Sequence, residues 1–415
     1  MHEKLTLKNG VRIVHEYMPH VRTASVGVWV GVGSRFETRT QSGAAHYIEH
    51  MLFKGTKTRT AAQLAGEMDA IGGQINAFTT REATCFYAKV LDSHLYTAID
   101  LLCDMLFNSN FDPGDVTNER GVIAEEIDMY DDAPDDMVAE RMINKCFLSA
   151  LGRPVLGTRN SLKKLDSDTL RGFMTEHYTA GRIVVAISGS FSAQHLDYIE
   201  SAFSPMEKSR KRKPRHTEYT SCFTLKRKAI EQNHICLGFP GLSTGDDSRY
   251  TMQILSTVLG GGMSSRLFQT VREQNGLCYS IYSFNASFSE TGLFSIATAL
   301  SQDTQERAIR LIMDELSKLR DKGITKVELD RAREQSKASV LMSLESTSSR
   351  MNRIGFGELA LGGALSTEDV IQRYDAVTCE DVLALSNLVL NPEKMSFSAV
   401  GRVSPEDEYR RMVGM

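Results

Sequence analysis

The chain has 415 residues, of which 41% are hydrophobic and 24% charged, and its formal net charge at pH 7 is −4. This is the composition of an ordinary globular protein with two or more domains, and its charge gives no general attraction to nucleic acid or to an anionic membrane. The sequence has no apolar run of about 18 residues and no signal-peptide core behind its N-terminus, so it predicts neither a membrane span nor secretion.

The seven cysteines are scattered, odd in number and never spaced as Cys-x-x-Cys. We interpret them as small buried hydrophobes in a reducing compartment, without disulfides or a thiolate metal site. An Arg-rich, acid-poor transit peptide is also missing. These features favour a bacterial cytoplasmic protein.

The first predicted elements are strands. Asn9-Gly10 suits the turn of a hairpin between residues 5–7 and 11–13. The valines at 26, 28, 30 and 32 alternate with glycine and tryptophan, which predicts a half-buried strand leading into the next helix.

That helix carries the most informative motif of the chain, His46-Tyr47-Ile48-Glu49-His50. Positions i and i+4 share a helix face, so His46 and His50 can hold one metal ion, and Glu49 is close enough to reach a water on it. The pattern is the reversed form of the His-Glu-x-x-His motif of zinc peptidases. Two imidazoles and a carboxylate suit zinc with a fourth position left for water, so we expect one zinc ion per chain.

Three further elements follow in order. Residues 60–71 predict a helix ended by Gly72-Gly73, and residues 76–91 predict a strand pair or one long strand. Residues 92–107 predict an amphipathic helix capped by Asp92 or Ser93.

A second carboxylate cluster offers the third zinc ligand. Glu119 and Glu126 are seven residues apart and therefore project from one helix face. One of them can ligate the metal while the other orients a histidine. Chemistry alone leaves the ligand ambiguous between Glu125 and Glu126, and a solvated acidic helix is the simpler explanation of the cluster.

A similar order of elements returns about 210 residues later. It comprises a strand near 235–239, a helix at 251–258, a strand pair over 279–300 and an amphipathic helix ended by Gly323. We predict an α+β fold made of two homologous domains from an internal duplication, each a largely antiparallel sheet with helices packed on it. The predicted boundaries are 1–204 for a zinc-binding domain, 205–222 for a basic linker, and 223–415 for a domain without a metal site.

The chain resembles the pitrilysin family of inverted-motif zinc peptidases, in the branch similar to the β-subunit of mitochondrial processing peptidase and its bacterial relatives. The resemblance rests on the His46–His50 motif and on the spacing of about 76 residues that follows it, and it spans nearly the whole chain. It implies Glu126 as the third ligand and Glu119 as the supporting carboxylate.

The resemblance also implies roles outside the metal motif. Arg272 and Tyr279 match the Arg/Tyr pair that contacts substrate, and Asn76-Ala77-Phe78 matches an edge strand to which an extended peptide adds by backbone pairing. Acidic residues near Asp136 and Glu140 match positions that receive a basic residue upstream of the cleavage site, although a solvated acidic surface is the simpler explanation of them. These three groups and Glu119 complete the predicted site.

The sequence therefore predicts a zinc metalloendopeptidase that cleaves extended or unfolded peptides inside a clamshell chamber, with Glu49 as general base. The family encloses substrate between four domains and this chain supplies two, so we expect a homodimer. The alternatives are a non-proteolytic scaffold subunit of the same fold and the catalytic half of a heterodimeric processing peptidase.

Overall fold

The computed structural model describes residues 2–208 and 214–414, in two compact units. Unit 1 comprises Met1–Ile127, Arg153–Arg215 and Leu341–Ser366, and unit 2 comprises Asp128–Gly152, His216–Val340 and Thr367–Met415. Within the described residues, no helix is both long and apolar enough to cross a membrane.

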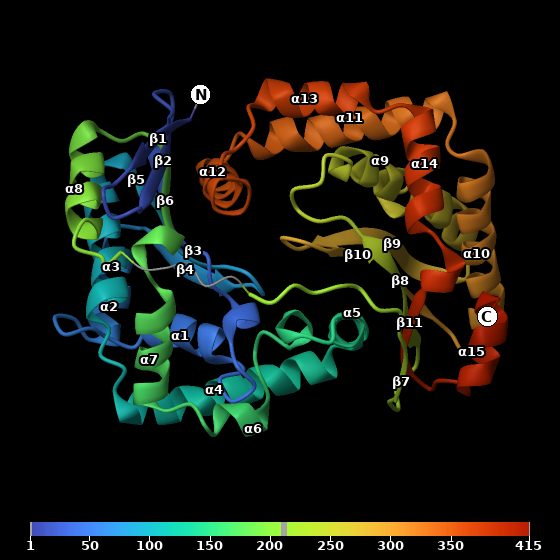
Figure 1. The fold of residues 1–415 in the computed structure, drawn as a ribbon, viewed down its shortest axis with the longest axis horizontal. Helices are drawn as coiled ribbons and strands as arrows, with labels where there is room; N and C mark the ends of the chain where they lie inside the picture. The colour runs from blue at the N-terminus through green and yellow to red at the C-terminus, as the bar shows by residue number, and fades with distance from the viewer. Residues whose placement is uncertain (1, 209–213, 415) are drawn as a thin grey trace. The chain divides into compact units, whose positions relative to one another are not determined.

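Unit 1 is built on a six-stranded sheet in the order β1-β2-β6-β3-β5-β4 (Figure 1). Only the pairing of β2 with β6 is parallel, so the sheet is largely antiparallel as predicted. The predicted hairpin turn is present, with Gly10 at φ 100° where a side chain would be strained. The strands are β1 (Glu3–Thr6), β2 (Arg12–Tyr17), β3 (Thr23–Val30), β4 (Gln74–Thr79), β5 (Thr84–Leu91) and β6 (Ile183–Gly189).

Unit 2 repeats this topology. Its five-stranded sheet has the order β7-β11-β8-β10-β9, with β7 and β11 parallel and the other pairs antiparallel. In their order across the sheet the five strands correspond one to one with β2, β6, β3, β5 and β4, which bears out the internal duplication. The strands are β7 (Phe223–Arg227), β8 (Asn233–Gly241), β9 (Cys278–Ser287), β10 (Gly292–Leu300) and β11 (Ser396–Gly401).

Helices cover each sheet. Unit 1 has the helices α1 (Ala44–Leu52), α2 (Ala61–Ala70), α3 (Leu95–Asn108), α4 (Pro113–Asp132, which runs into unit 2), α6 (Arg159–Leu162), α7 (Ser167–His177), α8 (Ala193–Phe203) and α12 (Thr347–Leu361). Unit 2 has the helices α5 (Pro134–Cys146), α9 (Arg249–Gly260), α10 (Gln305–Lys322), α11 (Lys326–Ser343, which runs into unit 1), α13 (Thr367–Ala376), α14 (Cys379–Val389) and α15 (Glu406–Val413).

The predicted helix at 92–107 starts differently from the prediction. A short 3-10 turn at Asp92–His94 precedes α3, and neither Asp92 nor Ser93 caps it with a side chain. The Asp92 carboxylate is used elsewhere, because it accepts a hydrogen bond from the Ser190 hydroxyl at 3.1 Å.

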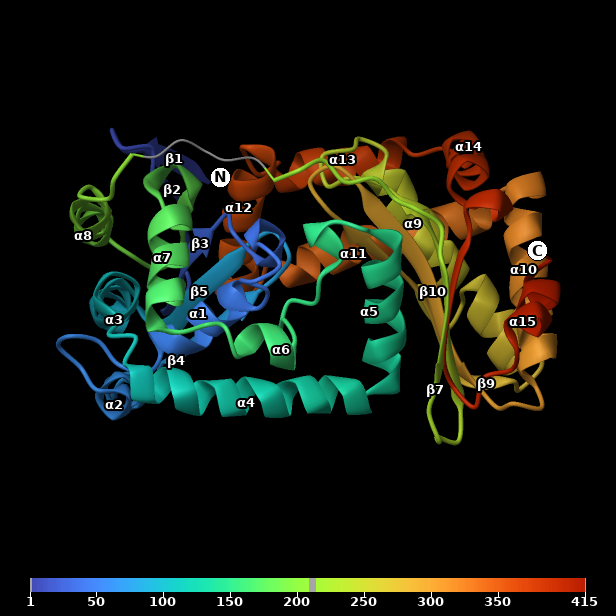
Figure 2. The ribbon, with the colours of Figure 1, turned by 60° about the horizontal axis from the view of Figure 1, so that its bottom comes forward.

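Each unit contains a helix from the other half of the sequence, so the compact units do not coincide with the predicted halves. Helix α12 comes from the C-terminal half but packs on β6, β3 and β2 of unit 1. Helix α5 comes from the N-terminal half but packs on β11, β8 and β10 of unit 2 (Figure 2). The compact units therefore differ from the predicted boundaries by two swapped segments, while residues 209–213 of the predicted linker lie outside the described residues.

Helix α12 also explains why β3 is buried on both faces instead of half-buried. On the covered face, a Cβ atom at Gly27 would lie 2.5 Å from Sδ of Met351, and one at Gly355 would lie 2.3 Å from Nε1 of Trp29. The end of the Met351 side chain could move away from a Cβ atom at Gly27, whereas the Trp29 ring and Ala186 leave no space for one at Gly355, so the close approach of helix and strand requires glycine there.

Candidate metal centre

Helix α1 presents the zinc motif from one edge of the unit 1 core. Tyr47, Ile48, Met51 and Leu52 are fully buried in the hydrophobic core, which fixes the rotation of the helix. The remaining face carries the polar residues, and the imidazole rings of His46 and His50 lie with centroids 4.6 Å apart. The i, i+4 geometry expected from the sequence is therefore present.

A buried carboxylate from outside the helix fixes its N-terminus. The two oxygens of Glu37 accept hydrogen bonds from the backbone N–H groups of Gly43 at 2.8 Å and Ala45 at 2.9 Å. Burial raises the pKa of Glu37 to about 8, against the lowering effect of these two bonds and of Arg153. Because a helix N-terminus has unsatisfied N–H groups, this carboxylate substitutes for a local cap and sets where α1 begins.

Helix α4 brings the carboxylates to the motif. Val116, Glu119 and Ile123 are its buried residues, and Glu126 continues the same face one turn further on. The hydroxyl of Tyr47 donates to the backbone carbonyl of Val116, which ties α1 directly to α4. The register between the two helices therefore determines which acidic residue faces the histidines.

Glu126, and not Glu125, is the carboxylate that meets both imidazoles. Its Oε2 lies 3.5 Å from Nε2 of His46 and 3.6 Å from Nε2 of His50. Four tetrahedral ligands at roughly 2.1 Å from zinc would be about 3.4 Å apart, so the donor set fits a zinc ion with little adjustment. These three residues form the single metal-compatible cluster found in the described part of the chain.

The charge states of His46 and Glu126 also suit a metal. Burial lowers the pKa of His46 to about 4, so its imidazole is neutral as a ligand must be. A hydrogen bond with His50 lowers the pKa of Glu126 below its usual range, which keeps the carboxylate ionised. Burial, by contrast, raises the pKa of Glu49, only partly offset by the hydrogen bond from Thr79. The ligands and the expected base are thus in different electrostatic environments.

Glu119 lies behind His50 and contacts the ring nitrogen that faces away from Glu126. Its Oε2 lies 3.0 Å from Nδ1 of His50, and its Oε1 accepts an ion pair from Nζ of Lys54 at 2.7 Å. A bond at Nδ1 leaves Nε2 of His50 facing Glu126, which is the orientation that a metal ligand needs.

Glu49 is also oriented. The hydroxyl of Thr79, at the end of β4, donates to Oε2 of Glu49 at 2.5 Å. The strand after the zinc helix thus positions the residue predicted as the base.

The predicted substrate-contacting residues lie outside the two helices that carry the metal cluster. Asn76, Ala77 and Phe78 lie on β4, the edge strand of the unit 1 sheet. In unit 2, the guanidinium of Arg272 lies 4.7 Å from the ring centroid of Tyr279, whose side chain is 79% exposed.

The two acidic residues predicted to bind a basic side chain are both on α5 of unit 2. Asp136 is exposed, and Glu140 is partly buried. Burial and the neighbouring Asp135 raise the pKa of Asp136.

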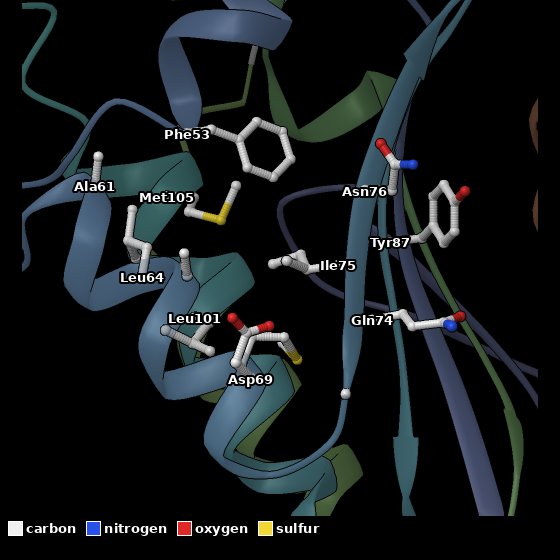
Figure 3. Close-up of a pocket in the computed structure, with 13 residues that line it drawn as sticks. Phe53, Ala61, Leu64, Asp69, Gln74, Ile75, Asn76, Tyr87, Leu101 and Met105 are labelled. Atoms are coloured by element: carbon white, nitrogen blue, oxygen red, sulfur yellow. The ribbon is translucent and has the colours of Figure 1, made fainter.

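A cavity of about 530 Å³ lies beside β4, between that strand and helices α2 and α3. Figure 3 shows Ile75 pointing into it toward Leu64 and Leu101, with Phe53, which directly follows α1, at one end. The wall is mostly aliphatic. An apolar side chain therefore has a place to bind next to the edge strand and the zinc helix.

Sequence reasoning missed three supporting residues. The position of Lys54 could have indicated its role, since it lies four residues after His50 and on the side that faces Glu119. Thr79 directly follows Asn76-Ala77-Phe78 in the sequence, but neither its type nor its spacing assigns it a role. Glu37 gave no local signal, because it reaches α1 from six residues before Gly43 through a loop.

Two sheets of one topology, with a His-His-Glu cluster in the first unit and Glu49 on the helix of the two histidines, define the class of inverted-motif zinc peptidases. Comparison with known proteins supports this class. The model described as "Insulinase (Peptidase family M16)" matches residues 12–159, and the model described as "Peptidase M16 inactive domain" matches residues 164–336. The chain belongs to peptidase family M16, the pitrilysin family, in its bacterial two-domain form, and is a zinc metallopeptidase.

Similar relatives span the whole chain. The "uncharacterized zinc protease YmxG" of Bacillus subtilis is 43% identical over 93% of this chain and 95% of its own length. A zinc protease of Streptomyces coelicolor is 41% identical over 98% and 91%. A crystal structure of a protease from Helicobacter pylori has the same fold, with a TM-score of 0.88 at 22% identity over 97% of this chain and 99% of that one.

Proposed function

We propose that this metallopeptidase is an endopeptidase acting on extended peptides, with Glu49 as its general base. The observation that carries the proposal is the joint geometry of His46, His50 and Glu126 at zinc-ligand spacing, with Glu49 oriented by Thr79 on the same face. A scaffold subunit of the same fold would have no use for this intact set.

The residues divide the reaction between them. His46, His50 and Glu126 would hold the zinc ion, which would supply a Lewis acid for the peptide carbonyl and lower the pKa of water to about 7. Glu49 accepts the proton of the attacking water and delivers it to the leaving amine. Burial raises the pKa of Glu49, which brings its affinity for that proton closer to what the transfer needs.

The test of the base is Glu49→Gln with Glu125→Gln as the matched control. Glu125 is exposed on α4 and contributes no ligand atom to the metal-compatible cluster. We expect Glu49→Gln to bind one zinc per chain and to lose turnover by about 10²–10⁴-fold, because both proton steps are lost. Glu125→Gln should keep zinc and activity. Turnover of Glu49→Gln within tenfold of the wild type would remove Glu49 from the mechanism.

Edge strand β4 supports the preference for extended peptides. The backbone N–H of Ala77 donates to Oδ1 of its neighbour Asn76 at 2.8 Å, a bond that a substrate carbonyl can replace. A peptide paired to this edge would run beside the apolar cavity at Ile75, which can accept one of its side chains.

This backbone recognition is testable with matched peptides that differ by one N-methyl group. Methylation removes a backbone donor and leaves the side chains unchanged, so we expect kcat/KM to fall at the positions that pair with β4. A mass-spectrometric survey on a peptide library should also show cleavage within unstructured peptides and a preference for an apolar residue near the cut. Equal cleavage of methylated and unmethylated peptides would argue against pairing.

We further propose that Asp136 and Glu140 favour substrates with a basic residue upstream of the cut. Their place on one helix face, four residues apart, supports a shared site for one cation. Asp136→Asn and Glu140→Gln should each reduce kcat/KM for a peptide with Arg at that position more than for its Ala counterpart. An equal reduction for both peptides would instead indicate a general effect on the fold.

A homodimer is our proposal for the assembly, with Arg272 and Tyr279 acting in trans. The exposed ring of Tyr279, stacked under Arg272, offers a donor pair to another chain. Mixed dimers of Glu49→Gln and Tyr279→Phe would each contain one intact site, so subunit exchange should restore about a quarter of the wild-type sites. Confirmed exchange without recovered activity would reject the trans arrangement and leave a heterodimer as the alternative.

The cytoplasmic location also stays a prediction.

A further inference from the structure

Two thiols from distant parts of the sequence meet in unit 2. The Sγ atoms of Cys146 and Cys222, which are 76 residues apart in the chain, lie 3.5 Å from each other. Cys146 ends α5 and is fully buried, whereas Cys222 directly precedes β7 and is partly exposed. Both are free thiols in this structure. No feature of the cysteine spacing in the sequence indicates this pair.

Contacts other than the one between the two sulfur atoms also hold the two segments together. The backbone N–H of Thr220 donates to the carbonyl of Cys146 at 2.9 Å. The hydroxyl oxygen of Ser396 lies 3.2 Å from Sγ of Cys146 and accepts the backbone N–H of Cys222 at 2.9 Å. A disulfide has an S–S length of about 2.05 Å, so the sulfur atoms need to approach by roughly 1.5 Å, which side-chain rotation can supply.

We propose that Cys146 and Cys222 are a reversible modification site, converted to a disulfide by a hydroperoxide. Cys222 is the first residue to react because it is the one that solvent reaches. Its thiolate sulfur attacks one peroxide oxygen, the O–O bond breaks, and hydroxide leaves to give a sulfenic acid. The sulfur of Cys146 then attacks Sγ of Cys222, the S–S bond forms, the S–O bond breaks, and water leaves with the thiol proton. With hydrogen peroxide, two thiols and one peroxide give one disulfide and two waters.

The local environment supports this order of events. A hydrogen bond from Cys146, together with Ser396 and the charge of Lys145, lowers the pKa of the Cys222 thiol, although burial opposes this. The same pairing and burial raise the pKa of Cys146. The exposed member is therefore the readier thiolate, and the buried member is the resolving thiol.

The bond would close a loop that contains a whole segment of unit 1. Residues Arg153–Arg215 lie between the two cysteines in the sequence, and the chain leaves unit 2 shortly after Cys146 and re-enters it shortly before Cys222. Oxidation would thus link covalently the segment of unit 2 that ends at Gly152 to the segment that begins at His216. Closing so long a loop restricts the unfolded chain strongly, so the oxidised protein should unfold at a higher temperature.

The experiment treats the reduced, zinc-loaded full chain with hydrogen peroxide, blocks the remaining thiols with iodoacetamide, and digests it with trypsin without reductant. We expect a cross-linked pair of the peptides 146–159 and 216–226, two hydrogen masses below their sum, which dithiothreitol separates. The thermal midpoint should rise on oxidation and return with dithiothreitol. In Cys146→Ala, dimedone should trap a sulfenic acid at Cys222, and the cross-link should be absent.

Cys379 is the internal control, since it is also a partly exposed free thiol and has no sulfur partner recorded within residues 2–208 and 214–414. It should remain alkylatable at the peroxide dose that converts most of the Cys146 and Cys222 pair. Cys222→Ser should abolish the cross-link and the midpoint shift while retaining zinc, which separates the result from the peptidase proposal. Recovery of Cys146 and Cys222 as alkylated thiols at a dose that oxidises Cys379, or a cross-link from Cys222 to another cysteine, would overturn the proposal.

Discussion

Glu119 offers the sharpest test of how the metal centre is built, because it touches a ligand without being one. Its carboxylate bridges Nδ1 of His50 at 3.0 Å and Nζ of Lys54 at 2.7 Å, and its side chain is 7% exposed. Glu119→Ala removes the acceptor that fixes the tautomer and ring orientation of His50. Glu119→Gln keeps an acceptor but removes the charge.

The magnitude follows from that contact. A hydrogen bond to a charged group contributes about 1.5–3 kcal/mol, and every 1.4 kcal/mol is a factor of ten in affinity. We therefore expect Glu119→Ala to weaken zinc binding by about 10–100-fold, the range found for outer partners of metal-bound histidines. Glu119→Gln should lose roughly tenfold. Lys54 is left without its partner in Glu119→Ala, but its side chain is 35% exposed, so water can solvate the ammonium at little cost in stability.

The assay is competition for zinc against a chromogenic chelator at fixed pH, with Glu125→Ala as the control from the exposed side of the same helix. Circular dichroism of the metal-free proteins checks that α4 remains folded. Affinity of Glu119→Ala within threefold of Glu125→Ala would show that the Glu119–His50 contact does not prepare the ligand. Loss of zinc with an intact fold would support it.

Three further outcomes are expected. Thr79→Val should lower kcat by about tenfold while Thr79→Ser retains it, because only a hydroxyl can orient Glu49; steady-state kinetics at constant zinc content would show this. Although burial opposes it, hydrogen bonds from Arg266 and Thr325 lower the pKa of Glu328 from 4.5 to about 2. An acid with a lowered pKa stabilises the fold at pH values above its unfolded pKa, and this stabilisation is lost as the pH falls from 4.5 to 2. Glu328→Gln should therefore lower the free energy of unfolding by roughly 1–2 kcal/mol at pH 7 and by little near pH 2, as measured by urea unfolding. Chelation of zinc should abolish peptidase activity and lower the thermal midpoint, and one equivalent of zinc per chain should restore both.

Much of the site followed from the sequence because it is local. The spacing of His46, Glu49 and His50 on one helix requires no tertiary information, and helical periodicity places Glu119 and Glu126 on one face of the next carboxylate-bearing helix. The choice between Glu125 and Glu126 was different. It came from the resemblance to a family, and in the structure Glu126 is the residue that faces the histidines because the contact of Tyr47 with Val116 sets the register of α1 against α4.

The fold class and the duplication were also predictable, since the order and period of hydrophobic segments repeat. The burial of β3 was not, because its alternating pattern is typical of a strand with one solvated face. The covering helix α12 begins more than 300 residues later, and only the close approach at Gly355 shows why that position is glycine.

What the sequence determined by itself is thus the chemistry that lies within a few helical turns: the zinc motif, its candidate base, the carboxylate helix and the repeated order of strands. Short-range periodicity is sufficient for these, because the residues involved are neighbours along one element. Only the tertiary structure decided which elements meet. The cap of α1 by Glu37, the orientation of Glu49 by Thr79, the exchange of α5 and α12, and the Cys146–Cys222 pair all join segments whose separation in sequence leaves no local pattern. Their contacts depend on packing of the whole unit, which periodicity cannot specify.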